Sequence, residues 1–119
     1  MISKKQSEQI FLEALCSFNY LRNYGLELAY NFSDYQTVRK NCPDLSFEEV
    51  LMHLLRKGDS IRVLDFEGDY NSEIRIGDIW DKVPTANLRH LAAIAEGNYD
   101  ADDCDAVLQT VFFGEVIFG

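Results

Sequence analysis

SFEEVLMHLLRKGDSIRVLDF, residues 46–66, passes from a helix pattern to a strand pattern and so decides the fold class. Ser46 and Glu49 have the spacing of a capping box, in which each side chain accepts a hydrogen bond from the other residue's backbone N–H at the start of a helix. Apolar residues then recur on one helical face, and Gly58 follows two basic residues where a helix typically ends. We therefore predict a helix over residues 47–57.

The apolar pattern changes directly after this helix. Residues 60–66 and 73–80 are rich in β-branched and aromatic side chains, and the turn-forming segment EGDYNS lies between them. We predict that the two segments pair as an antiparallel hairpin. Residues 115–119, EVIFG, are typical of a short buried strand and are a candidate third member of the sheet.

The N-terminal region predicts one long helix. Ser3 and Gln6 resemble a capping box, and apolar residues then recur every seven positions for about four heptads. Gly25 falls inside this stripe, where a glycine costs about 1 kcal/mol relative to alanine. Because the apolar phase continues past Gly25, we predict that the helix continues too and that another element packs closely over the glycine.

The same region carries more aromatic side chains than one buried stripe requires. Tyr20, Tyr24 and Tyr30 are the surplus rings. A second face of the helix is therefore expected to be covered, either by this chain or by a second copy of it.

Two shorter helices are predicted from their end signals. One covers about residues 34–40 and stops before Pro43, since the residue before a proline disfavours helix. The other covers residues 86–96, with Thr85 as N-cap and Gly97 as C-cap.

The last predicted helix covers residues 102–113, with Asp102 as N-cap and Gly114 at its end. It is expected to bury Val107, Leu108, Val111 and Phe112. Its short connection to the preceding helix predicts an αα-hairpin.

The predicted fold is therefore a single α+β domain over residues 1–119. Residues 1–57 are mainly helical, and residues 58–119 form a β-hairpin followed by a helical hairpin. The net charge of −9 divides in the same way. The first part has seven acids and seven bases, whereas the second has thirteen acids and four bases. This field disfavours direct nucleic-acid binding and favours a partner with a basic surface.

The acidic stretch NYDADDCDAV, residues 98–107, does not match a calcium loop. A calcium-binding EF-hand loop needs glycine at position 6 and a bidentate glutamate at position 12, where this stretch has Asp103 and Gln109. A second acidic run, from Asp65 to Glu73, lacks the same two residues. Acids at a helix start are instead stabilised by the helix dipole. We expect no metal site and no cofactor.

Helix capping does not account for all of the acids. On a strand, Asp65, Glu67 and Asp69 would face one way about 6.6 Å apart, from the rise per residue. With the other acids they are expected either to mimic nucleic acid toward a basic groove or only to keep the protein soluble. Trp80 is expected to fold over the core or to anchor a partner. The candidate partner-binding residues are Asp65, Glu67, Asp69, Glu73, Asp78, Trp80, Asp81, Tyr99, Asp100, Asp102, Asp103 and Asp105.

Nothing in the sequence indicates catalysis. His53 and His90 lie off the apolar faces of their helices with no metal-ligand spacing, and no phosphate-binding or nucleophile motif occurs. Cys104 would lie at a helix start, but neighbouring carboxylates oppose its thiolate. Since no catalytic motif is found, we expect a protein that is not an enzyme. The separate cysteines and the absence of an apolar export or membrane segment predict a cytoplasmic location.

The expected function is binding. The charge and size predict a regulatory or inhibitory protein–protein interaction module whose acidic half meets a basic partner surface. Immunity proteins and anti-defence proteins that mimic DNA are an analogy of size and charge rather than a family. The alternatives are a homo-oligomeric structural component and, third, a small hydrolase or a cation-binding module.

Overall fold

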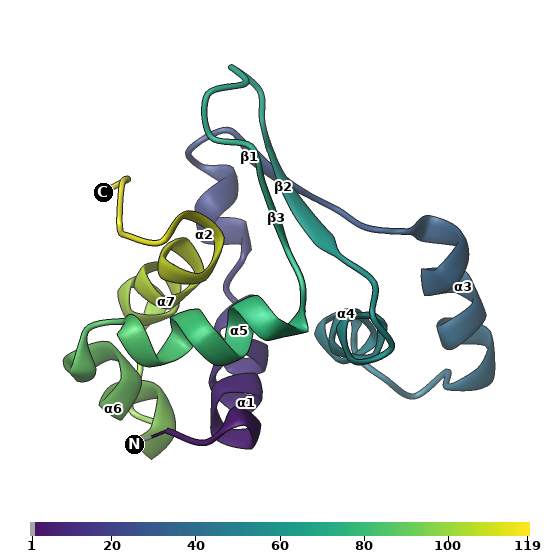
Figure 1. Ribbon diagram of the computed structural model, residues 1–119, viewed down its shortest axis with the longest axis horizontal. Coiled ribbons are helices and arrows are strands. Elements are labelled where there is room, and N and C mark those ends of the chain that lie inside the picture. Colours follow the sequence, from purple (N-terminus) through teal and green to yellow (C-terminus); the bar gives the residue numbers. More distant parts are fainter. Residues whose placement is uncertain (1) are drawn as a thin grey trace.

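The computed structural model describes residues 2–119, without the side chain of Tyr20. It shows an α+β fold, as predicted (Figure 1). The elements in chain order are α1 (Lys4–Leu15), α2 (Asn19–Arg22), β1 (Leu26–Ala29), α3 (Phe32–Asn41), α4 (Phe47–Arg56), β2 (Ile61–Asp65), β3 (Ser72–Ile74), α5 (Ile76–Lys82), the 3-10 helix η1 (Val83–Thr85), α6 (Leu88–Glu96) and α7 (Ala101–Phe113).

The strands form an antiparallel sheet in the order β1-β2-β3. Leu28 of β1 lies opposite Val63, which lies opposite Ser72 of β3. On that face Ile61, Val63 and Ile74 are buried, and Leu28 and Ser72 are half-buried. Arg62 and Glu73 lie opposite each other on the exposed face. The sheet therefore has one core face and one solvent face, as antiparallel sheets commonly do.

The stretch that decides the fold behaves as its sequence predicts. In α4 the Ser46 Oγ accepts a hydrogen bond from the Glu49 N–H at 3.2 Å, and a Glu49 carboxylate oxygen accepts one from the Ser46 N–H at 3.0 Å. Gly58 takes the left-handed conformation after the helix, with φ +109°. The predicted helix over 47–57 and the β2–β3 hairpin are confirmed.

The prediction of one long N-terminal helix is wrong. The α1 helix ends at Leu15, and Gly25 has a φ of +81°, which ends the following turn and sends the chain into β1. A left-handed backbone is easy for glycine and strained for other residues, so Gly25 serves as a turn rather than as a close-packing site in a helix. Leu28, which continued the apolar stripe after Gly25, is half-buried on the strand β1 instead of on a helix. Phe32, which ended the stripe, is 62% exposed.

The second predicted strand is too long. β3 ends at Ile74, and α5 begins where the Asp78 carboxylate accepts a hydrogen bond from the Arg75 N–H at 2.8 Å. The predicted strand over residues 115–119 is also wrong, because β1 is the third strand of the sheet. The backbone of 115–119 is bonded instead to the side chain of Gln109.

The C-terminal helices are confirmed, with shifted starts. Asn87 caps α6 in place of Thr85, and Asp100 caps α7 in place of Asp102. Gly97 ends α6 in the left-handed conformation, as predicted. The predicted core face of α7 is buried, and it packs against α1 and α6; its residues are Val107, Leu108, Val111 and Phe112. No helix in the described part of the chain is long and apolar enough to cross a membrane.

Candidate functional site

The candidate partner-binding residues occupy three separate parts of the fold. The first group lies on the β2–β3 hairpin, the second on α5, and the third between α6 and the first turns of α7. Figure 1 shows the hairpin turn at one end of the molecule, far from α6. The groups are Asp65, Glu67, Asp69 and Glu73; Asp78, Trp80 and Asp81; and Tyr99, Asp100, Asp102, Asp103 and Asp105.

The predicted row of acids on one strand is wrong. Asp65 is the last residue of β2, and Glu67 and Asp69 lie in the turn that follows. The Asp65 carboxylate accepts hydrogen bonds from the N–H groups of Glu67 at 3.0 Å and Tyr70 at 3.1 Å. Asp65 therefore organises the turn, and this arrangement leaves Glu67 and Asp69 exposed.

The hairpin turn carries exposed aromatic side chains. Phe66 is 79% exposed, and its N–H donates to the carbonyl oxygen of Gly25 at 3.1 Å. Tyr70 is 44% exposed, and its ring centroid lies 5.2 Å from that of Phe118. Phe118 in turn stacks on Tyr24 at 4.9 Å. The hairpin turn, the turn before β1 and residues 115–119 therefore meet in one aromatic cluster.

We define the hairpin patch as the exposed residues of this region. Its apolar members are Phe66, Tyr70 and Val116, and its acidic members are Glu67, Asp69 and Glu115. Within residues 2–119 none of these three carboxylates makes a hydrogen bond or an ion pair. Residues 63–74 and 90–119 contain no lysine or arginine. On the neighbouring strand β1, Glu27 is already paired with Arg22 at 3.8 Å. The patch is therefore apolar, anionic and without a cation of its own along these segments.

The α5 group is mostly bound within the fold. Trp80 is half-buried, and its Nε1 donates to a carboxylate oxygen of Glu8 at 2.9 Å, while the Lys4 ammonium lies 4.3 Å from the ring centroid. Burial alone would raise the pKa of Glu8, but hydrogen bonds from Arg56 and Trp80 lower it overall. Trp80 thus covers α1, and Asp81 is the exposed acid of this group.

The acids around the start of α7 have different roles. Asp100 and Asp103 form the capping box of the helix, so the helix-start interpretation is correct with a two-residue shift. An oxygen of Asp103 lies 2.6 Å from the Nδ1 of His90, and this hydrogen bond lowers the pKa of Asp103. Asp102 is exposed. Asp105 is buried, and burial raises the pKa of its carboxyl.

Tyr99 is tied to the first helix. Its hydroxyl donates to a carboxylate oxygen of Glu13 at 2.8 Å, and this bond raises the pKa of Tyr99 to about 12. The phenol therefore remains a donor at neutral pH, and it fixes the Glu13 carboxylate in place. The heptad pattern gave no sign that Glu13 would face the α6–α7 connection.

The sequence patterns also missed a charged cluster around Lys57. Its ammonium lies 2.9 Å from a carboxylate oxygen of Asp34 and 3.7 Å from one of Asp59. The hydrogen bond from Lys57 lowers the pKa of Asp34, whereas burial and the neighbouring Asp34 raise the pKa of Asp59. This cluster joins α3 to the segment that follows α4. Capping and helix-face signals do not report such contacts, because they relate residues of one element.

The described residues offer little for nucleophilic chemistry. Cys42 and His53 line one hollow, but no hydrogen bond joins them in residues 2–119. Burial raises the pKa of the Cys104 thiol, which opposes thiolate formation. No group of three or more His, Cys, Asp or Glu side chains in the described part of the chain is placed to hold a metal ion.

Comparisons with protein-family models, with curated proteins and with solved structures find no match to this chain.

Proposed function

We propose that the protein acts by binding, as a regulatory or inhibitory module whose hairpin patch meets the basic surface of a protein partner. One observation carries this proposal: a phenylalanine that is 79% exposed lies in the same turn as the unpaired carboxylates of Glu67 and Asp69, with no lysine or arginine in residues 63–74. Exposed aromatic side chains are typical anchors of protein interfaces, and the surrounding charge selects the partner.

The two components of the patch contribute differently. Burying a side chain such as Phe66 contributes roughly 1.5–3 kcal/mol, because its apolar surface leaves water. The carboxylates of Glu67, Asp69 and Glu115 attract a basic surface from a distance and repel acidic competitors. Affinity is therefore expected to depend mostly on the aromatic side chains, and specificity mostly on the acids.

A basic protein surface has more support here than a groove that normally holds nucleic acid. Mimicry requires carboxylates spaced like phosphates on one surface. The acids lie in three parts of the fold, and several are engaged in capping or turn formation, namely Asp65, Asp78, Asp100 and Asp103. The net charge is therefore the one remaining argument for mimicry of nucleic acid.

The homo-oligomer alternative has lost its main argument. It depended on surplus aromatic rings of a long helix, but Tyr24 stacks on Phe118, and Tyr30 packs against Tyr35 and Phe47 in the same chain. The side chain of Tyr20 lies outside the described residues.

The proposal is tested by affinity capture from the native host with matched phenylalanine variants. Phe66→Ala is expected to weaken capture of a basic partner about tenfold or more, from the apolar area it removes. Phe32→Ala is the control, because Phe32 is also exposed but lies on α3 outside the patch. The double variant Glu67→Gln, Asp69→Asn should weaken capture at low salt more than at high salt. Equal losses for the Phe66 and Phe32 variants, or capture that is unchanged by salt, would contradict the proposal.

A further inference from the structure

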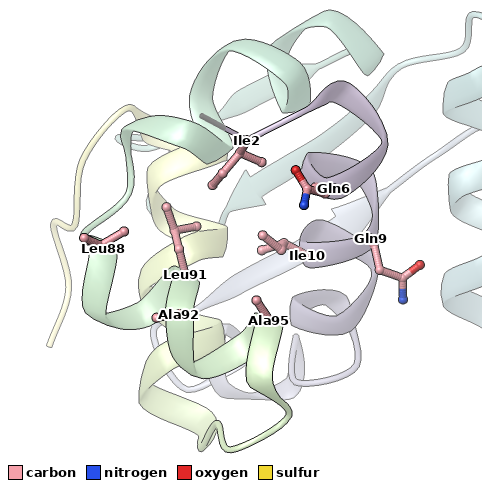
Figure 2. A pocket seen from close by; sticks show the side chains of 8 residues that line it. All are labelled: Ile2, Gln6, Gln9, Ile10, Leu88, Leu91, Ala92 and Ala95. Atoms are coloured by element: carbon pink, nitrogen blue, oxygen red, sulfur yellow. The ribbon is translucent and has the colours of Figure 1, made fainter.

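A groove runs between α1 and α6, on a part of the molecule away from the hairpin patch (Figures 1 and 2). It has a volume of about 380 Å³. Figure 2 shows Ile2 and Ile10 on the α1 side and Leu91 and Ala95 on α6 around the space between the two helices. Gln9 points away from that space.

The groove has a closed floor and an open rim. Ile10 and Leu91 are almost fully buried and form the floor. Leu88 is 76% exposed at one end of the rim. Ala92 and Ala95, also exposed on α6, have small side chains that protrude little from the helix. A protruding leucine beside small side chains exposes an apolar surface that residues 2–119 do not cover.

The groove continues into an acidic end. A second hollow, of about 440 Å³, shares Gln9, Ile10 and Ala95 with the first and extends to Glu13, Glu96 and Tyr99. The Glu13 carboxylate accepts hydrogen bonds from Tyr99 Oη at 2.8 Å and from Gln9 Nε2 at 3.2 Å. Both donors are neutral, so the carboxylate is held in place with its charge uncompensated.

No cation in the described chain neutralises this end. Neither Glu13 nor Glu96 makes an ion pair in residues 2–119, and residues 90–119 contain no lysine or arginine. A ligand that covered these carboxylates would have to supply positive charge, since burying an unpaired carboxylate is costly. The carboxylates therefore favour a ligand that is basic at this end, and the apolar lining favours apolar side chains of the same ligand at the other end.

We propose that this groove seats an amphipathic helix of a partner protein, apolar along one face and carrying lysine or arginine at one end. A third helix is the usual cover for two neighbouring helices, because its side chains fill the space between them. Leu88 and Ala95 are seven residues apart on α6, about 10.5 Å along the axis, so the apolar contact takes about two turns. The occupant then presents apolar residues at i, i+3 or i+4, and i+7, with a basic residue about one turn further on, opposite Glu13 and Glu96.

This inference goes beyond the hairpin patch and does not depend on it. It is tested by selecting a phage-displayed library of random 16-residue peptides on the full-length protein and measuring the affinity of the enriched peptides. The expected peptides combine the apolar spacing with lysine or arginine at one end. Peptides that lack a basic residue, or that lack the spacing, would overturn the proposal.

Variants of α6 identify the binding surface. Ala92→Gln fills the groove with a neutral side chain and is expected to weaken the enriched peptides about tenfold, by blocking apolar contact. Glu96→Gln is expected to weaken them a few-fold at 50 mM salt and less at 500 mM, as for screened charges. Arg89→Gln is the matched control, because Arg89 is exposed on α6 but does not line the groove. Phe66→Ala should leave peptide affinity unchanged, which separates this site from the hairpin patch.

Two further results would refute the proposal. Equal peptide affinity for the wild type and Ala92→Gln would show that the peptides bind elsewhere. Light scattering that shows a wild-type dimer, and a monomer for Ala92→Gln, would assign the groove to a second copy of this chain instead.

Discussion

Gln109 is expected to be the most sensitive polar residue of the fold. Its side chain is fully buried on α7 and joins the Asp105 carboxylate, which also accepts a hydrogen bond from the Tyr24 hydroxyl at 3.5 Å, to the backbone of residues 117 and 118. The amide nitrogen donates to both carboxylate oxygens of Asp105, at 3.0 and 3.1 Å, and to the Phe118 carbonyl oxygen at 3.2 Å. The amide oxygen accepts from the N–H groups of Ile117 and Phe118, both at 2.8 Å.

Replacement by leucine keeps the approximate shape of the side chain and removes all of these bonds. Each of the three bonds to residues 117 and 118 contributes roughly 0.5–1.5 kcal/mol. Loss of the Gln109 donor leaves the buried Asp105 carboxylate with the longer bond from the Tyr24 hydroxyl, at 3.5 Å, and costs roughly 1–3 kcal/mol. The contributions do not add fully, because the released backbone can bond to water. We expect Gln109→Leu to lower the free energy of unfolding by about 3 kcal/mol.

Urea denaturation measures the loss, and hydrogen exchange locates it. The Ile117 and Phe118 amides should exchange slowly in the wild type and fast in Gln109→Leu, while the amides of α4 remain protected. Gln36→Leu is the matched control, because Gln36 is exposed on α3 and should change stability by less than about 0.5 kcal/mol. A Gln109→Leu variant as stable as the control, with protected residues 117 and 118, would refute this account.

Three further substitutions test the turn, the buried acid and the helix cap. Gly25→Ala should lower the free energy of unfolding, measured by urea denaturation, by about 1–2 kcal/mol, because alanine is strained in the left-handed conformation. A clash does not add to this cost, since the new Cβ would meet Phe66 Cδ2 at an ordinary 3.5 Å. An unchanged urea midpoint would contradict backbone strain as the cause. Burial raises the pKa of Asp105, so the folded state holds its proton more tightly, and this contribution to stability falls as pH rises from the ordinary aspartate pKa through the raised one. Asp105→Asn should flatten that part of a stability–pH profile, and an identical profile would count against burial as the cause. Asp100→Ala should lower the free energy of unfolding by about 1 kcal/mol, because Asp100 is the N-cap of α7. Asp102→Ala should lower it much less. A larger loss for Asp102→Ala would indicate that Asp102 caps the helix, as the sequence predicted.

Local signals predicted the elements whose ends depend on neighbouring residues. The Ser46–Glu49 capping box and Gly58 bounded α4, and Gly97 and Gly114 ended α6 and α7 as expected. These signals are reliable because each one satisfies backbone groups within the same helical end.

Elements that depend on distant partners could not be predicted in the same way. Leu26–Ala29 becomes a strand because it pairs with β2, and the paired residues are 33 to 39 positions apart in the chain. The heptad phase contains no information about that pairing. Residues 115–119 are apolar like a strand, but their backbone bonds to the Gln109 side chain, so composition indicated their burial and not their conformation.

The sequence predicted that the candidate site would be acidic, but it did not predict where the free acids lie in the fold. Composition located the acids in residues 58–119, but only the structure separates capping acids from free ones. It also identifies Glu8 and Glu13 of α1 as partners of Trp80 and Tyr99. Residues from the charge-balanced part of the chain thereby enter the site region, which a division of the sequence by net charge excluded.

The remaining free acids argue against solubility as their only role. A surface that only keeps a protein soluble mixes both signs of charge and avoids exposed apolar patches. Here the unpaired carboxylates of Glu67, Asp69 and Glu115 belong to the same patch as the exposed Phe66, and Glu96 lies at the end of an apolar groove. Each location combines apolar area, which favours association, with one sign of charge, which restricts the partners. If solubility were their only role, neutralising the acids at either location would change aggregation without changing the affinity of any partner.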